Sequence, residues 1–249
     1  MKLILHGYQG RMGRAILAQT DEIVAGVDVI QTQETFATYK TLAEVKEAAD
    51  VVIDFSNVSA VADLVADCVA KGLPLVLCTT GLTAELEDKL LKASAHIPIF
   101  KSVNMSLGIN LMNRFLSQYS GALHALGFDI EILEYHHNQK VDAPSGTAVL
   151  LTKTIGEAVT GGLTPATDRY DTQRKRDPKE IGVHSIRGGS IVGKHTVMFA
   201  GDKETIELTH TIDDRTMFAK GALVAARFLV GQPAGMYEMA HVLDEMMGK

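Results

Sequence analysis

This 249-residue sequence is poor in cysteine and tryptophan and has no surplus of positive charge. It contains no tryptophan and two cysteines, Cys68 and Cys78, which are too few for a disulfide framework. Lysine and arginine number 24 against 30 aspartates and glutamates, which gives a formal net charge of -6. A protein that binds nucleic acid needs an excess of positive charge on at least one face, so we expect no nucleic-acid partner.

Long apolar runs are missing as well. No segment approaches the roughly 20 apolar residues of a membrane-spanning helix. The apolar run near the start, residues 3–5, is shorter than the roughly 7 to 15 residues of a signal-peptide core. We therefore expect a cytoplasmic protein without a membrane partner. Its 46% apolar and 22% charged residues are typical of a globular protein with a real core.

Short apolar segments alternate with helical patterns over the first hundred residues. We predict strands at residues 3–5, 23–27, 51–54, 75–78 and 97–100. Apolar residues three and four positions apart predict helices at residues 12–19, 60–70 and 85–93. This order is typical of βαβ units around a parallel sheet.

The pattern changes after Gly108. We predict helices at 109–119 and from about 147, and strands at 129–135, 183–187, 194–200 and 205–212. A polar stretch at 161–180 is predicted to be a mobile surface loop, and helices at 218–230 and 237–246 end the chain. The sequence thus predicts two domains, residues 1–107 with 216–249 and residues 108–215. The second is an α+β domain with a mixed or antiparallel sheet.

Three glycines, Gly7, Gly10 and Gly13, follow the first predicted strand and precede the first helix. Glycines in this place let the backbone turn tightly and approach a pyrophosphate, although an ordinary glycine-rich turn fits the GxxGxxG spacing about as well. Asp28 ends the second predicted strand about 20 residues on, where a carboxylate accepts from both ribose hydroxyls. Together these residues predict an α/β, Rossmann-like, doubly wound domain that binds a dinucleotide.

The surroundings of Asp28 favour NADH over NADPH. Val29 stands where an NADPH-preferring site often has an arginine, and the charge of Asp28 would repel a 2′-phosphate. Arg11 and Lys40 are the nearby cations that would support NADPH. We expect NADH to be the better or an equal cofactor.

The densest run of reactive side chains lies within residues 131–148. His136, His137 and Lys140 lie between a predicted strand and a helix that begins after Ser145. An imidazole that titrates near neutrality can protonate a carbanion-like centre. The hydroxyl and backbone groups at the helix start can bind a carboxylate, although by themselves they fit a simple helix cap equally well.

Three other interpretations stay open. Glu134 and His136 share a strand face and could hold a metal, although no further ligand has convincing spacing. Cys78 could be the nucleophile of a semialdehyde dehydrogenase, which requires a histidine beside the thiol, or simply a small buried residue. A redox-sensing protein that binds the nucleotide without catalysis would need a basic DNA-binding element, which the sequence does not supply.

The run from His136 to Ala148, HH-x-x-K-x-DAPSGTA preceded by a glutamate, resembles the signature of the 4-hydroxy-tetrahydrodipicolinate reductases (dihydrodipicolinate reductases) of lysine and diaminopimelate biosynthesis. The glycine loop and the segments at 54–56, 79–81 and 104–108 resemble the cofactor-side motifs of that family, in the same order. The resemblance covers nearly the whole chain. It implies an oxidoreductase that reduces 4-hydroxy-tetrahydrodipicolinate, with loss of water, to tetrahydrodipicolinate by using NADH or NADPH.

The resemblance also implies roles for individual residues. His136 and Lys140 would be the proton donors, and a small dicarboxylate would be bound by His137, Ser145, Gly146 and Thr147. It implies no metal. Cofactor contacts would come from Gly7, Tyr8, Gln9, Gly10, Arg11, Met12, Asp28, Phe55, Cys78, Thr79, Thr80, Ser102, Val103, Asn104 and Met105.

Two positions depart from the pattern of the family. Cys78 stands where glycine is usual, and Met105 stands where phenylalanine is usual. Both are expected near the nicotinamide, so they bear on cofactor affinity more than on the reaction. The resemblance further implies a homotetramer built through the sheet of the second domain, and a cleft between the domains that closes on the substrate.

Overall fold

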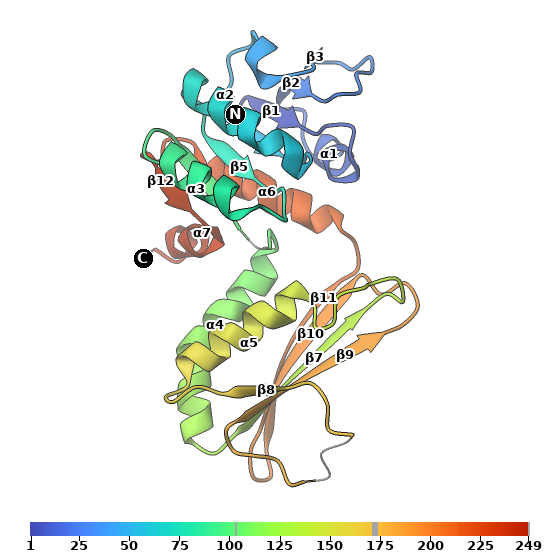
Figure 1. The fold of residues 1–249 in the computed structure, drawn as a ribbon, viewed down its shortest axis with the longest axis vertical. Coiled ribbons are helices and arrows are strands. Elements are labelled where there is room, and N and C mark those ends of the chain that lie inside the picture. The colour runs from blue at the N-terminus through green and yellow to red at the C-terminus, as the bar shows by residue number, and fades with distance from the viewer. Residues whose placement is uncertain (103, 171–173, 249) are drawn as a thin grey trace. The chain divides into compact units, whose positions relative to one another are not determined.

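The computed structural model describes residues 1–102, 104–170 and 174–248. They form two compact units, one of Met1–Leu107 with Thr216–Lys249 and one of Gly108–Arg215 (Figure 1). The second unit is therefore inserted into the sequence of the first. Within the described residues, no helix is both long enough and apolar enough to cross a membrane.

A seven-stranded sheet forms the centre of the first unit, and every strand pairing in it is parallel. The strand order is β12-β6-β5-β4-β1-β2-β3. The chain goes from β1 to β2 and β3 on one side and then to β4 on the other, so the order reverses beside β1, where such sheets bind ligands. The strands are β1 (Leu3–His6), β2 (Ile23–Val27), β3 (Ala37–Tyr39), β4 (Val51–Asp54), β5 (Leu75–Leu77), β6 (Pro98–Lys101) and β12 (Gly235–Tyr237).

Helices cover both faces of this sheet, because successive side chains of a parallel strand point to opposite sides and both sides are apolar. Leu3 and Leu5 of β1 belong to one core, whereas Ile4 belongs to the other. The first core is covered by α1 (Arg11–Leu17), α6 (Thr216–Leu229) and α7 (Met239–Met246). The second is covered by α2 (Val61–Lys71) and α3 (Ala84–Ala93), with two short 3-10 helices at Leu42–Glu44 and Val58–Ala60. The predicted doubly wound parallel sheet is confirmed.

The second unit contains a mixed five-stranded sheet with the order β11-β10-β7-β9-β8. The central β7 is antiparallel to β10 and parallel to β9. Two helices, α4 (Leu107–Ala125) and α5 (Gly146–Ala158), cover the face that carries Ile130 and Ile132 (Figure 1). The strands are β7 (Asp129–His136), β8 (Thr164–Ala166), β9 (Glu180–Arg187), β10 (Gly193–Ala200) and β11 (Thr205–Ile212). The predicted mixed-sheet α+β domain is confirmed as well.

The structure departs from the predicted elements where local patterns are weak. The strands β3, β8 and β12 have three residues each, and so short a segment carries little periodicity. Helix α4 continues past its predicted end at residue 119 to Ala125, and this last part passes close to α5. A Cβ atom on Gly121 would lie 2.3 Å from the carbonyl oxygen of Ala158.

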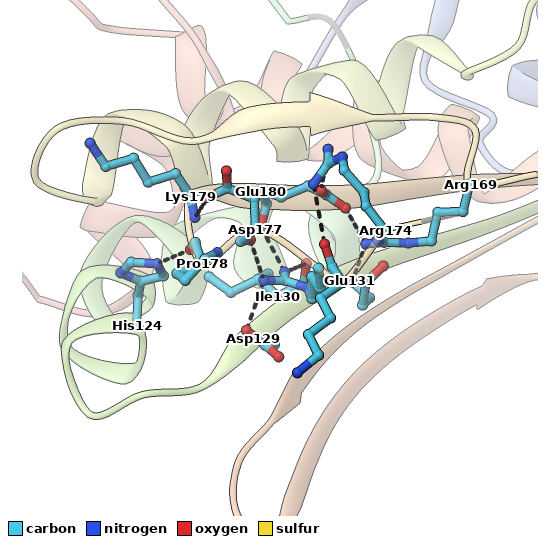
Figure 2. A network of polar contacts seen from close by, with 12 residues as sticks. His124, Asp129, Ile130, Glu131, Arg169, Arg174, Asp177, Pro178, Lys179 and Glu180 are labelled. Carbon is cyan, nitrogen blue, oxygen red and sulfur yellow. Dashed lines mark hydrogen bonds and ion pairs between the residues drawn. The ribbon is translucent and has the colours of Figure 1, made fainter. Parts of the chain in front are cut away.

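The polar stretch before β9, which we predicted as a mobile loop, contains β8 and several ion pairs (Figure 2). Arg176 binds the carboxylates of Asp129 and Glu131 at 2.7 and 3.0 Å. Arg174 binds Glu180, which is buried, at 3.1 Å. These contacts attach the stretch to the first residues of β7 and β9.

Candidate active site

The reactive run predicted from the sequence lies in the second unit, where β7 ends and α5 begins. Residues alternate between the two faces of a strand, so Glu134 and His136 lie on the face of β7 that the helices cover. Ser145 caps α5, because its hydroxyl accepts the backbone N–H of Ala148 at 3.2 Å. The backbone N–H of Ser145 in turn donates to Glu134 at 3.1 Å, which joins the strand to the start of the helix.

Glu134 is the centre of this cluster, and its side chain is fully buried. Arg187 donates to both of its carboxylate oxygens, at 2.7 and 2.8 Å. Burial alone would raise the pKa of Glu134, but the hydrogen bonds from Arg187, Ser185 and His136 outweigh burial and hold the pKa at about 2. Glu134 is therefore ionised at neutral pH.

Nδ1 of His136 lies 2.5 Å from a carboxylate oxygen of Glu134. An ionised carboxylate can only accept hydrogen bonds, so Nδ1 carries a proton and Nε2 is left for chemistry. Burial lowers the pKa of His136, and the nearby charges of Lys140 and Arg187 act in the same direction, while Glu134 opposes them. The imidazole is thus mainly neutral at neutral pH until a negative charge binds beside it.

Sequence reasoning missed two members of this cluster, Arg187 and His195. Strand register brings them in: Arg187 of β9 lies opposite His136, and His195 of β10 lies opposite Glu134. Nε2 of His195 lies 3.0 Å from the hydroxyl of Ser145. The signal that would have found them is the pairing of β7 with β9 and β10, which no single segment of the sequence contains.

Three residues lie close enough together to hold a metal ion, since ligand atoms of Glu134, His136 and His195 lie within 4.8 Å of one another. However, the guanidinium of Arg187 occupies both oxygens of Glu134, and its positive charge opposes a cation at that place. The contact between Glu134 and His136 is instead the kind that fixes the tautomer and orientation of an imidazole.

Lys140 lies on the loop between β7 and α5. Its ammonium group forms an ion pair with Asp142 at 2.7 Å. Gly146 is exposed in the first turn of α5, and Thr147 beside it is half-buried. The sequence-predicted substrate residues at the helix start are thus brought next to the cluster around Glu134, through Ser145.

His137 faces a different group, Arg215, which lies outside the motifs of the sequence. The two residues line a cavity of about 500 Å³, together with Ser190, Val192 and two aspartates. Nη2 of Arg215 approaches Nε2 of His137 to 3.5 Å. The guanidinium of Arg215 can bind an anionic ligand group beside His137, and the two aspartates of the same lining oppose it.

The glycine loop lies at the end of β1 in the first unit. Gly7 has φ of +80°, and a Cβ atom there would lie 2.7 Å from the carbonyl oxygen of Phe55. A Cβ atom on Gly13 would lie 2.3 Å from the carbonyl oxygen of Gly7. Both positions therefore require glycine, and the loop leaves bare backbone at its surface.

Asp28 lies directly after β2, beside this loop. One of its oxygens accepts the backbone N–H of Gln9 and the other that of Ile30, both at 3.1 Å. A cavity of about 510 Å³ in the first unit is lined by Gly7, Gln9, Gly10, Asp28, Lys40 and Phe55, among others. These residues fit a dinucleotide, since backbone amides suit a pyrophosphate and the carboxylate suits ribose hydroxyls.

Several predicted cofactor residues lie apart from the lining of this cavity. Tyr8 is fully buried, and its hydroxyl accepts the backbone N–H of Thr32 at 3.0 Å. The hydroxyl of Thr79 donates to buried Asp54 at 2.6 Å. Arg11 and Thr80 are exposed, Met12, Ser102 and Asn104 are half-buried, and Met105 is buried. Val103 lies outside the described residues.

Cys78 follows β5 and packs against the first core. Its desolvation there, together with the nearby Asp54 carboxylate, raises the pKa of the thiol well above its usual range. A thiol must ionise to act as a nucleophile, so this environment opposes the semialdehyde dehydrogenase interpretation. Cys78 is better explained as an apolar packing residue.

Comparisons with known proteins identify the family of the chain. The family models "Dihydrodipicolinate reductase, N-terminus" and "Dihydrodipicolinate reductase, C-terminus" match residues 1–105 and 108–243. A 4-hydroxy-tetrahydrodipicolinate reductase of Caldanaerobacter subterraneus is 45% identical, over 98% of this chain and 99% of the relative. The reductase of Clostridium tetani is 47% identical, over 98% of this chain and 97% of the relative.

A solved structure, the dipicolinate-bound dihydrodipicolinate reductase from Paenisporosarcina sp. TG-14, has the same fold. It aligns with a TM-score of 0.78 and 22% sequence identity, over 96% of this chain and 97% of that one. The fold, the reactive run after β7 and two family models that together span most of the chain all agree. This chain belongs to the dihydrodipicolinate reductase family.

Proposed function

We propose that the chain reduces 4-hydroxy-tetrahydrodipicolinate, with loss of water, and that His136 and Lys140 supply the protons. Membership of the family makes the chain an oxidoreductase of lysine and diaminopimelate biosynthesis that uses a nicotinamide cofactor. The assignment of residues is supported best by the contact between Glu134 and His136, which leaves Nε2 as the reactive nitrogen.

The bound nicotinamide supplies a hydride to a conjugated imine, and the enamine that results needs a proton. Nε2 of His136 is the donor. Its pKa is lowered in the free protein, but a dicarboxylate beside the ring raises it and so brings a proton to the site with the substrate. Lys140 exchanges Asp142 for the substrate and gives a second positive charge with three donors.

The substrate carboxylates are held at two places. The start of α5 offers the backbone N–H groups of Gly146 and Thr147 and the hydroxyl of Ser145 to one of them. His137, with Arg215 beside it, suits the other. With both carboxylates bound, the ring is held in one orientation. A fixed orientation of the reacting groups lowers the activation barrier.

NADH is the better or an equal cofactor in this proposal. Asp28 lies in the lining of the cavity beside the glycine loop, where its charge repels a 2′-phosphate. Val29 is exposed and offers no charge. Lys40 lines the same cavity and is the group that supports residual use of NADPH.

The chain also forms a homotetramer through the sheet of the second unit. The face of this sheet away from α4 and α5 carries the apolar side chains of Leu133, Tyr135, Ile186 and Met198, which are only partly buried. Partly exposed apolar groups on one sheet face are typical of a surface that another chain covers. Light scattering after size exclusion tests this: a monomeric mass at micromolar concentration would refute it.

One assay tests the reaction. The purified protein is mixed with NADH and the condensation product formed from pyruvate and aspartate semialdehyde, and NADH oxidation is followed by its absorbance. We expect rapid oxidation that depends on the condensation product. Oxidation that proceeds equally with pyruvate or with the semialdehyde alone would show that the substrate is a different one.

A further inference from the structure

The hydroxyl of Ser145 has more partners than a helix cap needs. Ser145 is 2% exposed, and its Oγ accepts the N–H of Ala148 at 3.2 Å. The same Oγ lies 3.0 Å from Nε2 of His195, which is 3% exposed. A hydroxyl has one donor and two acceptor sites, so the direction of its proton depends on whether His195 donates or accepts.

The surroundings of His195 decide this. Burial lowers the pKa of His195 to about 4; the positive charges of His136, His210 and Lys140 act in the same direction, and the Glu134 carboxylate opposes them. The ring is therefore neutral at neutral pH and carries one proton. Its Nδ1 is buried and, within the described residues, has no hydrogen-bond partner.

Of the two tautomers, one leaves a buried N–H without an acceptor and the other leaves only a lone pair without a donor. Unsatisfied buried N–H groups are rare and costly. His195 therefore carries its proton on Nε2 and donates it to Ser145. Both acceptor sites of the Ser145 oxygen are then used, by the N–H groups of Ala148 and His195, and its proton is left for another acceptor.

We propose that His195 is a positioning residue that makes the Ser145 hydroxyl a donor to a substrate carboxylate at the start of α5. This rests on the proposed function, which brings a dicarboxylate there. If residue 195 accepted instead, Ser145 would turn its proton away and present a lone pair to the carboxylate, which is repulsive. His195 thus acts on substrate affinity through Ser145 without touching the reacting atoms.

Binding of dipicolinate, a ring with two carboxylates, provides the test. We expect His195→Leu to weaken dipicolinate binding about tenfold or more, the range for a lost hydrogen bond to a charged group. KM for the substrate should rise in parallel, and by a larger factor than any fall in kcat, because His195 bonds to Ser145 but meets the proton donor His136 only through a ring contact, with 5.2 Å between the ring centroids. His195→Gln, whose amide can still donate, should recover most of the affinity.

Ser145→Ala provides the matched background. If His195 acts through the hydroxyl, His195→Leu has no further effect on dipicolinate binding once Ser145 is alanine. Effects that multiply in the double variant would overturn the positioning role. If Ser145→Ala alone binds dipicolinate as tightly as the unmodified protein, the carboxylate site of the proposed function is itself wrong.

A direct readout is made on the unmodified protein, and a variant serves only to assign the signal. Nitrogen NMR of the histidine-labelled protein reports which ring nitrogen of His195 carries the proton, assigned by loss of the signal in His195→Gln. We expect the proton on Nε2 at neutral pH. A proton on Nδ1 would overturn the proposal.

Discussion

Arg187 and Glu134 face each other from neighbouring strands and are joined by two hydrogen bonds, of 2.7 and 2.8 Å. The pair contacts the proposed proton donor, because Glu134 also accepts a hydrogen bond from Nδ1 of His136. The Glu134 carboxylate therefore both pairs with the charge of Arg187 and orients the imidazole of His136. Its removal should affect both stability and turnover.

Glu134→Gln leaves Arg187 without a charged partner and gives His136 an amide instead of a carboxylate. Loss of one member of a buried ion pair costs about 3 to 5 kcal/mol, and we expect the free energy of unfolding to fall by about that much. Urea denaturation measures it. The control is Asp88→Asn, which breaks the exposed pair with Lys92 and should cost less than about 1 kcal/mol.

His136→Gln and Lys140→Ala remove the proposed proton donors. Each should lower kcat by about 10² to 10⁴, the usual contribution of a positioned acid. NADH binding, followed by fluorescence, should stay near that of the unmodified protein, because neither residue lies in the unit that contains the glycine loop. Nearly full turnover in either variant would show that the donor is another group.

The free energy of unfolding should depend on pH through His195. Burial lowers its pKa from 6.5 to about 4, so between these values the unfolded chain binds a proton that the folded chain does not. The contribution of His195 to the free energy of unfolding is fully present above pH 6.5. It is lost as the pH falls toward 4, and the loss is roughly 3 kcal/mol. Urea denaturation at a series of pH values should show a steeper fall in the unmodified protein than in His195→Gln.

Gly7→Ala should impair both folding and NADH binding. An alanine with positive φ costs about 1 to 2 kcal/mol, and the added Cβ atom also meets the carbonyl oxygen of Phe55 at 2.7 Å. Gly72→Ala separates the cost of positive φ from the cost of the contact with Phe55. Gly72 also has positive φ, but a Cβ atom there would have no atom within 4 Å. Equal losses of stability in the two variants would mean that the contact with Phe55 has no cost.

The choice of cofactor provides another test. The ratio of kcat/KM for NADH to that for NADPH should be one or greater, and Lys40→Met should raise it by removing the cation that faces a 2′-phosphate. Lys46→Met, a change of another exposed lysine, is the control. A strong preference of the unmodified protein for NADPH would contradict the role given to Asp28.

Most of the fold followed from periodicity, since β2, β4 and β11 begin and end where their apolar patterns predict. The polar residues that surround Glu134 were harder to predict. Arg187 and His195 reach Glu134 only through the pairing of three strands, and Arg187 is 53 residues from it in the sequence. Local patterns fix which side of a strand a residue faces, but register across strands depends on the whole sheet.

The insertion of Gly108–Arg215 within the other unit has a consequence for biosynthesis. Helix α6 supplies Ala219, Ala222 and Ala226 to the first core, yet it is translated after the whole inserted unit. On that side of the nascent parallel sheet, α1 is therefore the only one of the three covering helices on the ribosome until the last segment emerges. The inserted unit has all of its own strands and helices by then, so it can fold first.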